Sequence, residues 1–201
     1  MPIIVGSPRS GTTLLRLMLD SHPDMAIPPE TGFLTIGPDL ALVEKDPRRH
    51  FAQSLINFPP DAPGWSDFRI SEEDFAAKIE ALEPFTVADG FRCFYQLYAE
   101  RFGKVRWGDK TPLYLLNMPM IESLLPEAHF IHIVRDGRDC AASLRSRFFS
   151  PGHAIAVQAE YWRTNVLTGR NEGAIITLNQ QPPVPIYPLV GQGDGYGERT
   201  Q

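Results

Sequence analysis

The residues with the clearest chemical potential lie near the start of the chain, in the stretch VGSPRSGTT. Gly6 and Gly11 at its two ends let the backbone wrap closely around a ligand. Free N–H groups of Gly11, Thr12 and Thr13, in the first turn of a following helix, then point at that ligand and favour a tetrahedral oxyanion. The pattern is nearly that of a nucleotide-binding P-loop, but Thr12 stands where the phosphate-binding lysine would be. The order strand, loop, helix favours this cradle over a glycine-rich turn without a ligand.

A lysine follows a second short stretch of strand-forming residues, in WGDKTP. Lys110 comes after a strand predicted at 105–108, Thr111 is placed to cap the next helix, and Pro112 suits its first turn. This position would bring the Lys110 ammonium to the mouth of the glycine loop. The alternative is a solvated surface lysine.

Two arginines and a serine lie in the stretch FIHIVRDGRDCAASLRSR. Arg135 ends a predicted buried strand, where a cation requires an anionic partner. Ser143 and Arg147 are four residues apart on the predicted helix and would share a face. An arginine fork, a hydroxyl and a second arginine form a good phosphate clamp. The alternative is that Arg135 pairs with Asp136 or Asp139.

Alternating strands and helices position these three groups. The residue pattern predicts a mainly parallel sheet covered by helices on both faces, a three-layer α/β fold like that of P-loop nucleoside-triphosphate hydrolases. Ligands of such sheets collect beyond the carboxyl ends of the strands. We predict strands at 3–6, 25–28, 105–108 and 129–134, and helices at 11–21, 71–82, 88–102, 112–125, 137–147 and 153–171, with several short helices between 31 and 70.

Local signals add detail to this outline. Ser71 is placed to cap the helix at 71–82, with Asp74 three residues on, as in a capping box. Aromatic residues at helical spacing favour core positions over contacts with a substrate: Trp65, Phe68, Phe91 and Tyr95. Cys93 and Cys140 stand apart without a CxxC or CxxH partner, which indicates buried free thiols rather than a disulfide or a metal site.

Length and composition limit the classes of protein. With 201 residues, 43% hydrophobic and 21% charged, the chain fits one globular domain. A net charge of −5 argues against nucleic acid or an anionic membrane as partner. No apolar run reaches the roughly 18 residues of a membrane span, and the first strand begins at once, so we expect no secretory signal and a cytoplasmic location.

Two anion sites at one sheet edge suit a nucleotide that is charged at both its 5′ and its 3′ positions, which ATP is not. PRSGTTLL resembles the 5′-phosphosulfate loop of sulfotransferases that use 3′-phosphoadenosine 5′-phosphosulfate (PAPS), and IVRDGRDCAASLRSR resembles their 3′-phosphate motif. The resemblance is to the bacterial sulfotransferases that group with the tyrosylprotein enzymes, in which arginine replaces lysine in the loop. It covers residues 2–171.

This resemblance implies a role for each matching residue, and no metal. Glu30 falls where the tyrosylprotein branch has its general base, and Lys110 matches its lysine near the leaving oxygen. His22 and His132 are alternative bases, although a helix-stop position and a strand position favour structural roles for them. Around the two ends of PAPS the resemblance places Arg9, Ser10, Gly11, Thr12 and Thr13 at the 5′-phosphosulfate, and Arg135, Ser143 and, in an assisting role, Arg147 at the 3′-phosphate.

The expected reaction is in-line transfer of the sulfuryl group to a hydroxyl or amine of a small-molecule, glycan or peptide acceptor. Members of this family continue beyond the helix that ends near residue 173, so we expect residues 1–173 to form a PAPS-binding domain that is incomplete at its C-terminal end. Residues 174–201, rich in proline and glycine, are predicted to be irregular and poorly ordered. Two alternatives stay open: a P-loop kinase or NTPase with an altered loop, and a truncated, inactive nucleotide-binding remnant.

Overall fold

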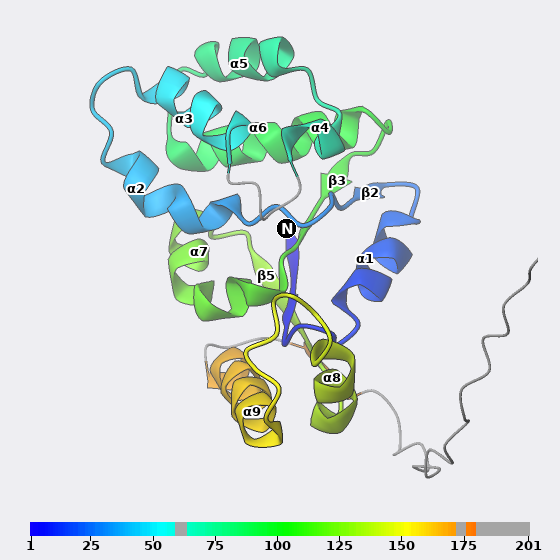
Figure 1. Ribbon diagram of the computed structural model, residues 1–201. Coiled ribbons are helices and arrows are strands. Elements are labelled where there is room, and N and C mark those ends of the chain that lie inside the picture. The colour runs from blue at the N-terminus through cyan, green and yellow to red at the C-terminus, as the bar shows by residue number, and fades with distance from the viewer. Residues whose placement is uncertain (59–63, 172–175, 180–201) are drawn as a thin grey trace, which may run out of the picture.

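The computed structural model describes residues 1–58, 64–171 and 176–179. A four-stranded sheet forms the centre of the molecule, in the order β4-β1-β5-β6, and every neighbouring pair is parallel (Figure 1). Its strands are β1 (Pro2–Gly6), β4 (Asp109–Lys110), β5 (His129–Val134) and β6 (Ile176–Asn179). A mixed α/β fold with a parallel sheet, as predicted, is therefore confirmed.

Side chains alternate between the two faces of β1 and pack into two separate cores. Ile4 joins Ile27 and Ile133 in a small cluster, against which Leu15 and Leu19 of helix α1 (Thr12–Asp20) pack. Ile3, Val5 and Phe130 belong to a much larger cluster that extends into the helices beyond the sheet. The sheet is thereby held on both faces, and its carboxyl edge is left for the loops after the strands.

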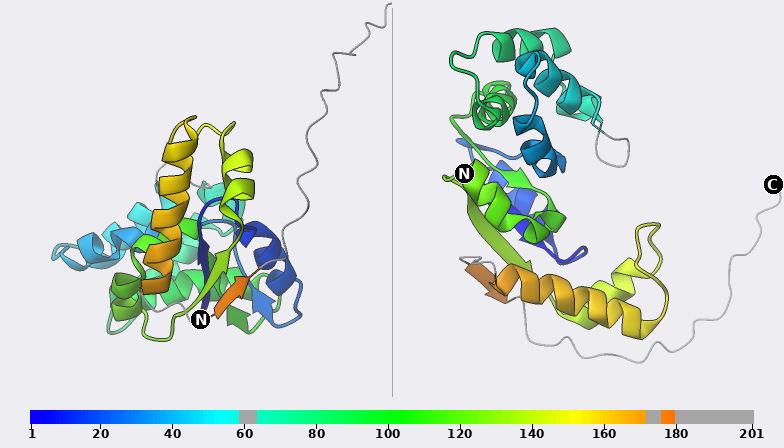
Figure 2. Two further views of the ribbon diagram at one scale, coloured as in Figure 1. Left: turned by 90° about the horizontal axis from the view of Figure 1, so that it is seen from below. Right: turned by 90° about the vertical axis from the view of Figure 1, so that its left-hand side faces the viewer.

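The larger core continues into a group of helices at one end of the molecule, whereas α8 (Gly137–Leu144) and α9 (Ile155–Asn171) lie at the other end (Figures 1 and 2). The aromatic residues predicted to be core, Trp65, Phe68, Phe91 and Tyr95, are all buried in this cluster. Ser71 caps α5 as predicted, since its hydroxyl accepts the Asp74 N–H at 3.1 Å. The group comprises η1 (Phe33–Ile36), α2 (Gly37–Ala41), α3 (Pro47–Ile56), α4 (Trp65–Phe68), α5 (Glu72–Glu80) and α6 (Val87–Glu100).

The segment from 105 to 125 differs from the prediction. In place of one strand at 105–108 there are two, β3 (Arg106–Trp107), which pairs with β2 (Met25–Ala26), and β4, which pairs with β1. The helix predicted at 112–125 is divided into η2 (Pro112–Leu116) and α7 (Met118–Leu124). Pro119 explains the division, because a continuous helix would place it in the interior, where proline has no N–H to donate.

The last predicted elements also need adjustment. Helix α8 ends at Leu144, so residues 145–147 of the predicted helix lie outside it. Within the range 174–201 that we predicted to be irregular, Ile176–Asn179 instead form β6, and β6 extends the sheet beside β5. Residues 174, 175 and 180–201 lie outside the described residues.

Candidate active site

The loop between β1 and α1 has the geometry of an anion cradle. A side chain at Gly6 would lie 2.7 Å from the Ile133 carbonyl oxygen and 2.8 Å from the Ser10 hydroxyl, so only glycine fits. Gly11, immediately before α1, has a φ of 106°, which favours glycine as well. The predicted residues Ser10, Gly11, Thr12 and Thr13 thus surround the start of α1, where first-turn N–H groups have no partner within the helix.

Two features of this loop favour a ligand. The Ser10 hydroxyl is buried and has no hydrogen-bond partner among the described residues. Arg9 has a left-handed backbone with a φ of 71°, which is uncommon for a residue with a side chain and is typical of functional sites. An oxyanion in the cradle would accept a hydrogen bond from Ser10 and balance the Arg9 charge.

Arg9 joins the cradle to the predicted phosphate clamp that contains Ser143. Its Nε donates a hydrogen bond of 2.9 Å to the Ser143 hydroxyl on α8, across 134 residues of sequence. The parallel pairing of β1 with β5 explains this proximity, because Gly6 is paired with Ile133 and both strands end at the same edge. Helix α9 also contacts this loop, because Asn165 donates a hydrogen bond to the buried Ser7 hydroxyl at 3.4 Å.

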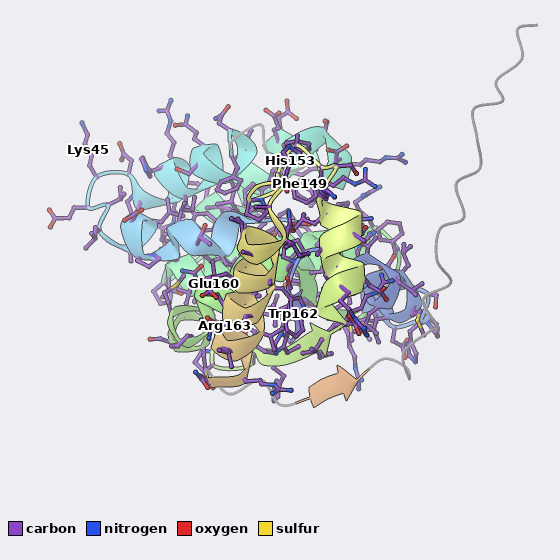
Figure 3. All side chains as sticks on the ribbon, turned by 60° about the horizontal axis from the view of Figure 1, so that its bottom comes forward. Lys45, Phe149, His153, Glu160, Trp162 and Arg163 are labelled. Atoms are coloured by element: carbon purple, nitrogen blue, oxygen red, sulfur yellow. The ribbon has the colours of Figure 1, made fainter. Side chains whose placement is uncertain are left out.

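Arg135 follows β5 at this edge and is paired within the protein. Its Nη2 lies 3.3 Å from Asp139 Oδ2, and 41% of its side chain is exposed. The pairing of Arg135 with Asp139, one alternative predicted from the sequence, is therefore present in the structure. The side chain of Trp162 on α9 lies on the side of α9 that faces α8 (Figure 3). Its indole N–H donates to the Arg135 carbonyl at 3.0 Å, which holds the backbone of Arg135 while its guanidinium stays accessible.

The predicted pairing of Ser143 with Arg147 on one helical face is wrong. Helix α8 ends at Leu144, so the spacing of four residues no longer places the two side chains on one face. Arg147 lies in the exposed turn after α8, and its N–H donates to the Leu144 carbonyl at 2.9 Å. A part for Arg147 in anion binding would require movement of this turn.

Glu30 and Lys110 come together from distant parts of the chain. Lys110 Nζ donates to Glu30 Oε2 at 2.8 Å; 7% of the lysine side chain and 42% of the glutamate side chain are exposed. Lys110 is the last residue of β4 rather than a residue after a strand, and it is paired with Ile4 of β1. Glu30 precedes η1 by three residues, so its contact is the lysine and not a helix terminus.

A buried polar cluster beside this pair was not predicted. Asp109 is fully buried in β4 and accepts hydrogen bonds from the hydroxyls of Thr31, Tyr95 and Thr111. Thr111 does not cap a helix as predicted, because its hydroxyl is directed to Asp109 instead. The one signal in the sequence was an acidic residue directly after the strand predicted at 105–108.

The two histidines considered as bases lie elsewhere. His22 is exposed in the turn after α1, at the opposite end of that helix from the cradle, and its Nδ1 accepts the Asp24 N–H at 3.1 Å. His132 is fully buried in β5, with both ring nitrogens lacking a partner among the described residues. Neither histidine forms a hydrogen bond with Glu30 or Lys110 in the part of the chain described.

Comparison with known proteins identifies the family of the chain. The model of the sulfotransferase family matches residues 3–177, and the chain belongs to this family. It is 33% identical over 149 residues to nodulation protein NoeE of Sinorhizobium fredii, 32% over 149 residues to protein-tyrosine sulfotransferase 1 of Homo sapiens, and 30% over 151 residues to protein-tyrosine sulfotransferase of Drosophila melanogaster.

These matches cover most of this chain but a minority of each relative. They include 74%, 73% and 73% of the present chain, and 32%, 35% and 26% of the relatives in the same order. The chain therefore spans about a third of the length of these curated relatives. The resemblance to the branch containing the tyrosylprotein enzymes is confirmed.

Membrane-spanning helices and metal-binding clusters are both absent from the described residues. No helix in the part of the chain with described structure is long and apolar enough to cross a membrane. Within the same residues, no group of three or more His, Cys, Asp or Glu side chains could hold a metal ion.

Proposed function

We propose that this chain forms the donor-binding part of a PAPS-dependent sulfotransferase, which transfers a sulfuryl group to a hydroxyl or amine. The observation that carries the proposal is the hydrogen bond of 2.9 Å between Arg9 and Ser143. It brings the cradle after β1 and the clamp after β5 within reach of one nucleotide that is anionic at both ends. A three-layer, P-loop-like arrangement of the sheet and helices is part of this proposal.

The residues present suit such a donor. The Ser10 hydroxyl has no hydrogen-bond partner in the described part of the chain, so it and the backbone N–H groups of Gly11, Thr12 and Thr13 are donors for a tetrahedral sulfate or phosphate. Arg135 and Ser143 supply a guanidinium and a hydroxyl for a second phosphate, once Asp139 and Arg9 release them. Arg147 would assist only after the turn that holds it has moved.

The chain's own groups then have separate tasks in the reaction. When bound, PAPS supplies the sulfuryl group: a bond from sulfur to the acceptor oxygen or nitrogen replaces the bond to the bridging phosphate oxygen, and 3′-phosphoadenosine 5′-phosphate leaves. Glu30 accepts the acceptor's proton. Arg9 and Lys110 balance negative charge on the bridging and phosphate oxygens, and the loop N–H groups hold the group in line.

The acceptor is proposed only as a class. Two relatives are named protein-tyrosine sulfotransferases, which supports a peptide acceptor for them. For this chain we keep a small-molecule, glycan or peptide acceptor. Residues 1–173 as the PAPS-binding domain and a cytoplasmic location stay predictions from the sequence.

Thermal unfolding with different nucleotides tests the proposal. 3′-Phosphoadenosine 5′-phosphate should raise the unfolding temperature most, since a ligand at 100 times its Kd stabilises a protein by about 2.7 kcal/mol. Adenosine 5′-phosphate lacks the second anion and should stabilise less. Stronger stabilisation by ATP with Mg²⁺ would favour the kinase or NTPase alternative. No preference for the 3′-phosphorylated nucleotide would overturn the proposal, and binding without transfer to any acceptor would favour the inactive remnant.

A further inference from the structure

The Asp109 carboxylate is the centre of a closed set of hydrogen bonds. It receives the Thr31 hydroxyl at 2.6 Å and the Tyr95 hydroxyl at 2.7 Å on Oδ2, and the Thr111 hydroxyl at 2.9 Å on Oδ1. Burial raises the pKa of Asp109, and hydrogen bonds from these three hydroxyls and the charge of Lys110 oppose that rise. A carboxylate surrounded by three hydroxyl donors acts as an acceptor at every contact.

The hydroxyls that donate to Asp109 also organise a backbone segment. The Thr31 hydroxyl donates its one hydrogen bond to Asp109, so the Tyr114 hydroxyl is the donor in the 3.0 Å contact between Tyr114 and Thr31. The Tyr114 oxygen accepts the Leu34 N–H at 2.9 Å, and the Thr111 oxygen accepts the N–H groups of Thr31 and Gly32 at 3.3 Å each. Three backbone N–H groups after Glu30 therefore depend on hydroxyls whose orientation Asp109 sets.

The segment before Glu30 is held from another direction. Arg16 of α1 donates to the carbonyls of Ile27 and Pro28 at 2.9 and 2.8 Å. Glu30 lies between this anchor and the Asp109 cluster, in a connection without secondary structure of its own. Lys110 directly follows Asp109 in β4, and successive strand residues point to opposite faces. Strand β4 thus carries both Lys110 and Asp109, and Asp109 anchors the segment that contains Glu30, the partner of Lys110.

We propose that Asp109 is a positioning residue that, through the hydroxyls of Thr31, Thr111 and Tyr114, holds the Glu30 segment so that its carboxylate meets Lys110. The inference rests on the proposed function, because it assigns a task to the cluster within that reaction. Asp109 itself is fully buried, so it is not offered as a catalytic residue. It acts through the place that it gives to Glu30.

Thr111 offers a matched test, because valine keeps its shape and serine keeps its hydroxyl. In Thr111→Val we expect amide hydrogen exchange of a peptide covering residues 28–36 to become about tenfold faster, as two N–H groups lose their acceptor. Thr111→Ser should restore the protection. Thr164→Val, which changes an exposed threonine on α9, is the control for a general effect of the substitution.

The same variants are then compared in sulfate transfer and in binding of 3′-phosphoadenosine 5′-phosphate. Thr111→Val should lower kcat about 10- to 100-fold, because misplaced groups lose near-attack geometry, and should leave nucleotide affinity within about twofold. Thr111→Ser should recover most of kcat. A purely structural role would lower the unfolding temperature of Thr111→Val without this separation of kcat from binding.

Amide hydrogen exchange tests the inference even if the chain transfers no sulfate. Unchanged exchange of residues 28–36 in Thr111→Val would overturn it, whereas a wild-type chain that protects this segment but transfers no sulfate would count against the proposed function alone. If Thr111→Val does not fold, Tyr114→Phe tests the cluster through the Leu34 N–H. The inference then requires faster exchange at Leu34 in Tyr114→Phe, and unchanged exchange there would overturn it.

Discussion

The ends of β4 and β5 lie at the same edge of the sheet but support their charged residues in different ways. At β4, 7% of the Lys110 side chain is exposed. The preceding residue, Asp109, accepts hydrogen bonds from three buried hydroxyls. At β5 and α8, the charges are half-exposed and neutralise one another: Arg135 pairs with Asp139, and Arg138 pairs with Asp136 at 2.6 Å. Hydrogen bonds from Arg138 lower the pKa of Asp136 to about 2.

If the proposed function holds, the β4 region is organised before a ligand binds, whereas Arg135 in the β5 region exchanges Asp139 for a phosphate. Exposed ion pairs contribute about 0–1 kcal/mol, so a phosphate can replace Asp139 at Arg135 with little loss of stability. A buried, fully hydrogen-bonded cluster resists such exchange, because any group left without a partner is costly. We expect the β4 region to control the rate of transfer and the β5 region to control affinity for the nucleotide.

The largest expected effect is that of Glu30→Gln on turnover. Glutamine keeps the size of the side chain but cannot accept a proton, so single-turnover sulfate transfer should fall about 10²- to 10⁴-fold. Binding of 3′-phosphoadenosine 5′-phosphate, measured by calorimetry, should stay close to the wild-type value. Undiminished transfer would remove Glu30 from the role of base, and a large loss of binding would contradict the division between the two regions.

Arg135→Gln should instead weaken nucleotide binding, and its effect should be smaller than that of Glu30→Gln on turnover. Loss of a charge-assisted hydrogen bond costs about 1.5–3 kcal/mol, so the affinity for 3′-phosphoadenosine 5′-phosphate should fall about 10- to 100-fold. Affinity for adenosine 5′-phosphate should change little, because that nucleotide lacks the 3′ anion. The comparison is made by titration calorimetry with both nucleotides.

Arg138→Gln is the matched control for this measurement. Arg138 lies on the same helix and also pairs with an aspartate, but 65% of its side chain is exposed and no predicted site residue contacts it among the described residues. Its replacement should leave both affinities within about twofold. An equal loss in both variants would mean that general positive charge, and not the position of Arg135, attracts the nucleotide.

Where the sequence predicted this structure well, the signal was local. HFIHIV predicts a strand at 129–134, and β5 has the same bounds. The need for glycine at Gly6 also has a local part, because a side chain there would lie 2.8 Å from the hydroxyl of Ser10 in the same loop. Ser71 caps α5 because the cap and its N–H donor are three residues apart.

Where the prediction failed, the deciding contacts join distant segments. Asp109 is stabilised in the interior by Thr31, 78 residues away, and by Tyr95, 14 residues away, as well as by its near neighbour Thr111. Thr111 had a local role available as a helix cap, but its hydroxyl instead accepts the N–H groups of Thr31 and Gly32, 80 and 79 residues away in the sequence. The proximity of Arg9 to Ser143 could be predicted as an edge of the sheet, but the bond itself depends on where α8 begins after β5.

The smallest expected effect is a change in the pH dependence of stability, caused by His132 in the interior beneath α9. Gly169 of α9 packs directly over its buried ring, and burial, with a smaller contribution from the charge of Arg170, lowers the pKa of His132 below its usual 6.5. The unfolded chain therefore binds more protons than the folded chain as the pH falls below about 6.5, and stability should decrease by up to about 1.4 kcal/mol per pH unit from this residue. Urea unfolding between pH 7.5 and 5.5 should show a shallower pH dependence for His132→Phe than for wild type, because phenylalanine does not titrate. Parallel curves would mean that another group limits stability under acid, and that the packing of α9 on β5 withstands a charge beneath it.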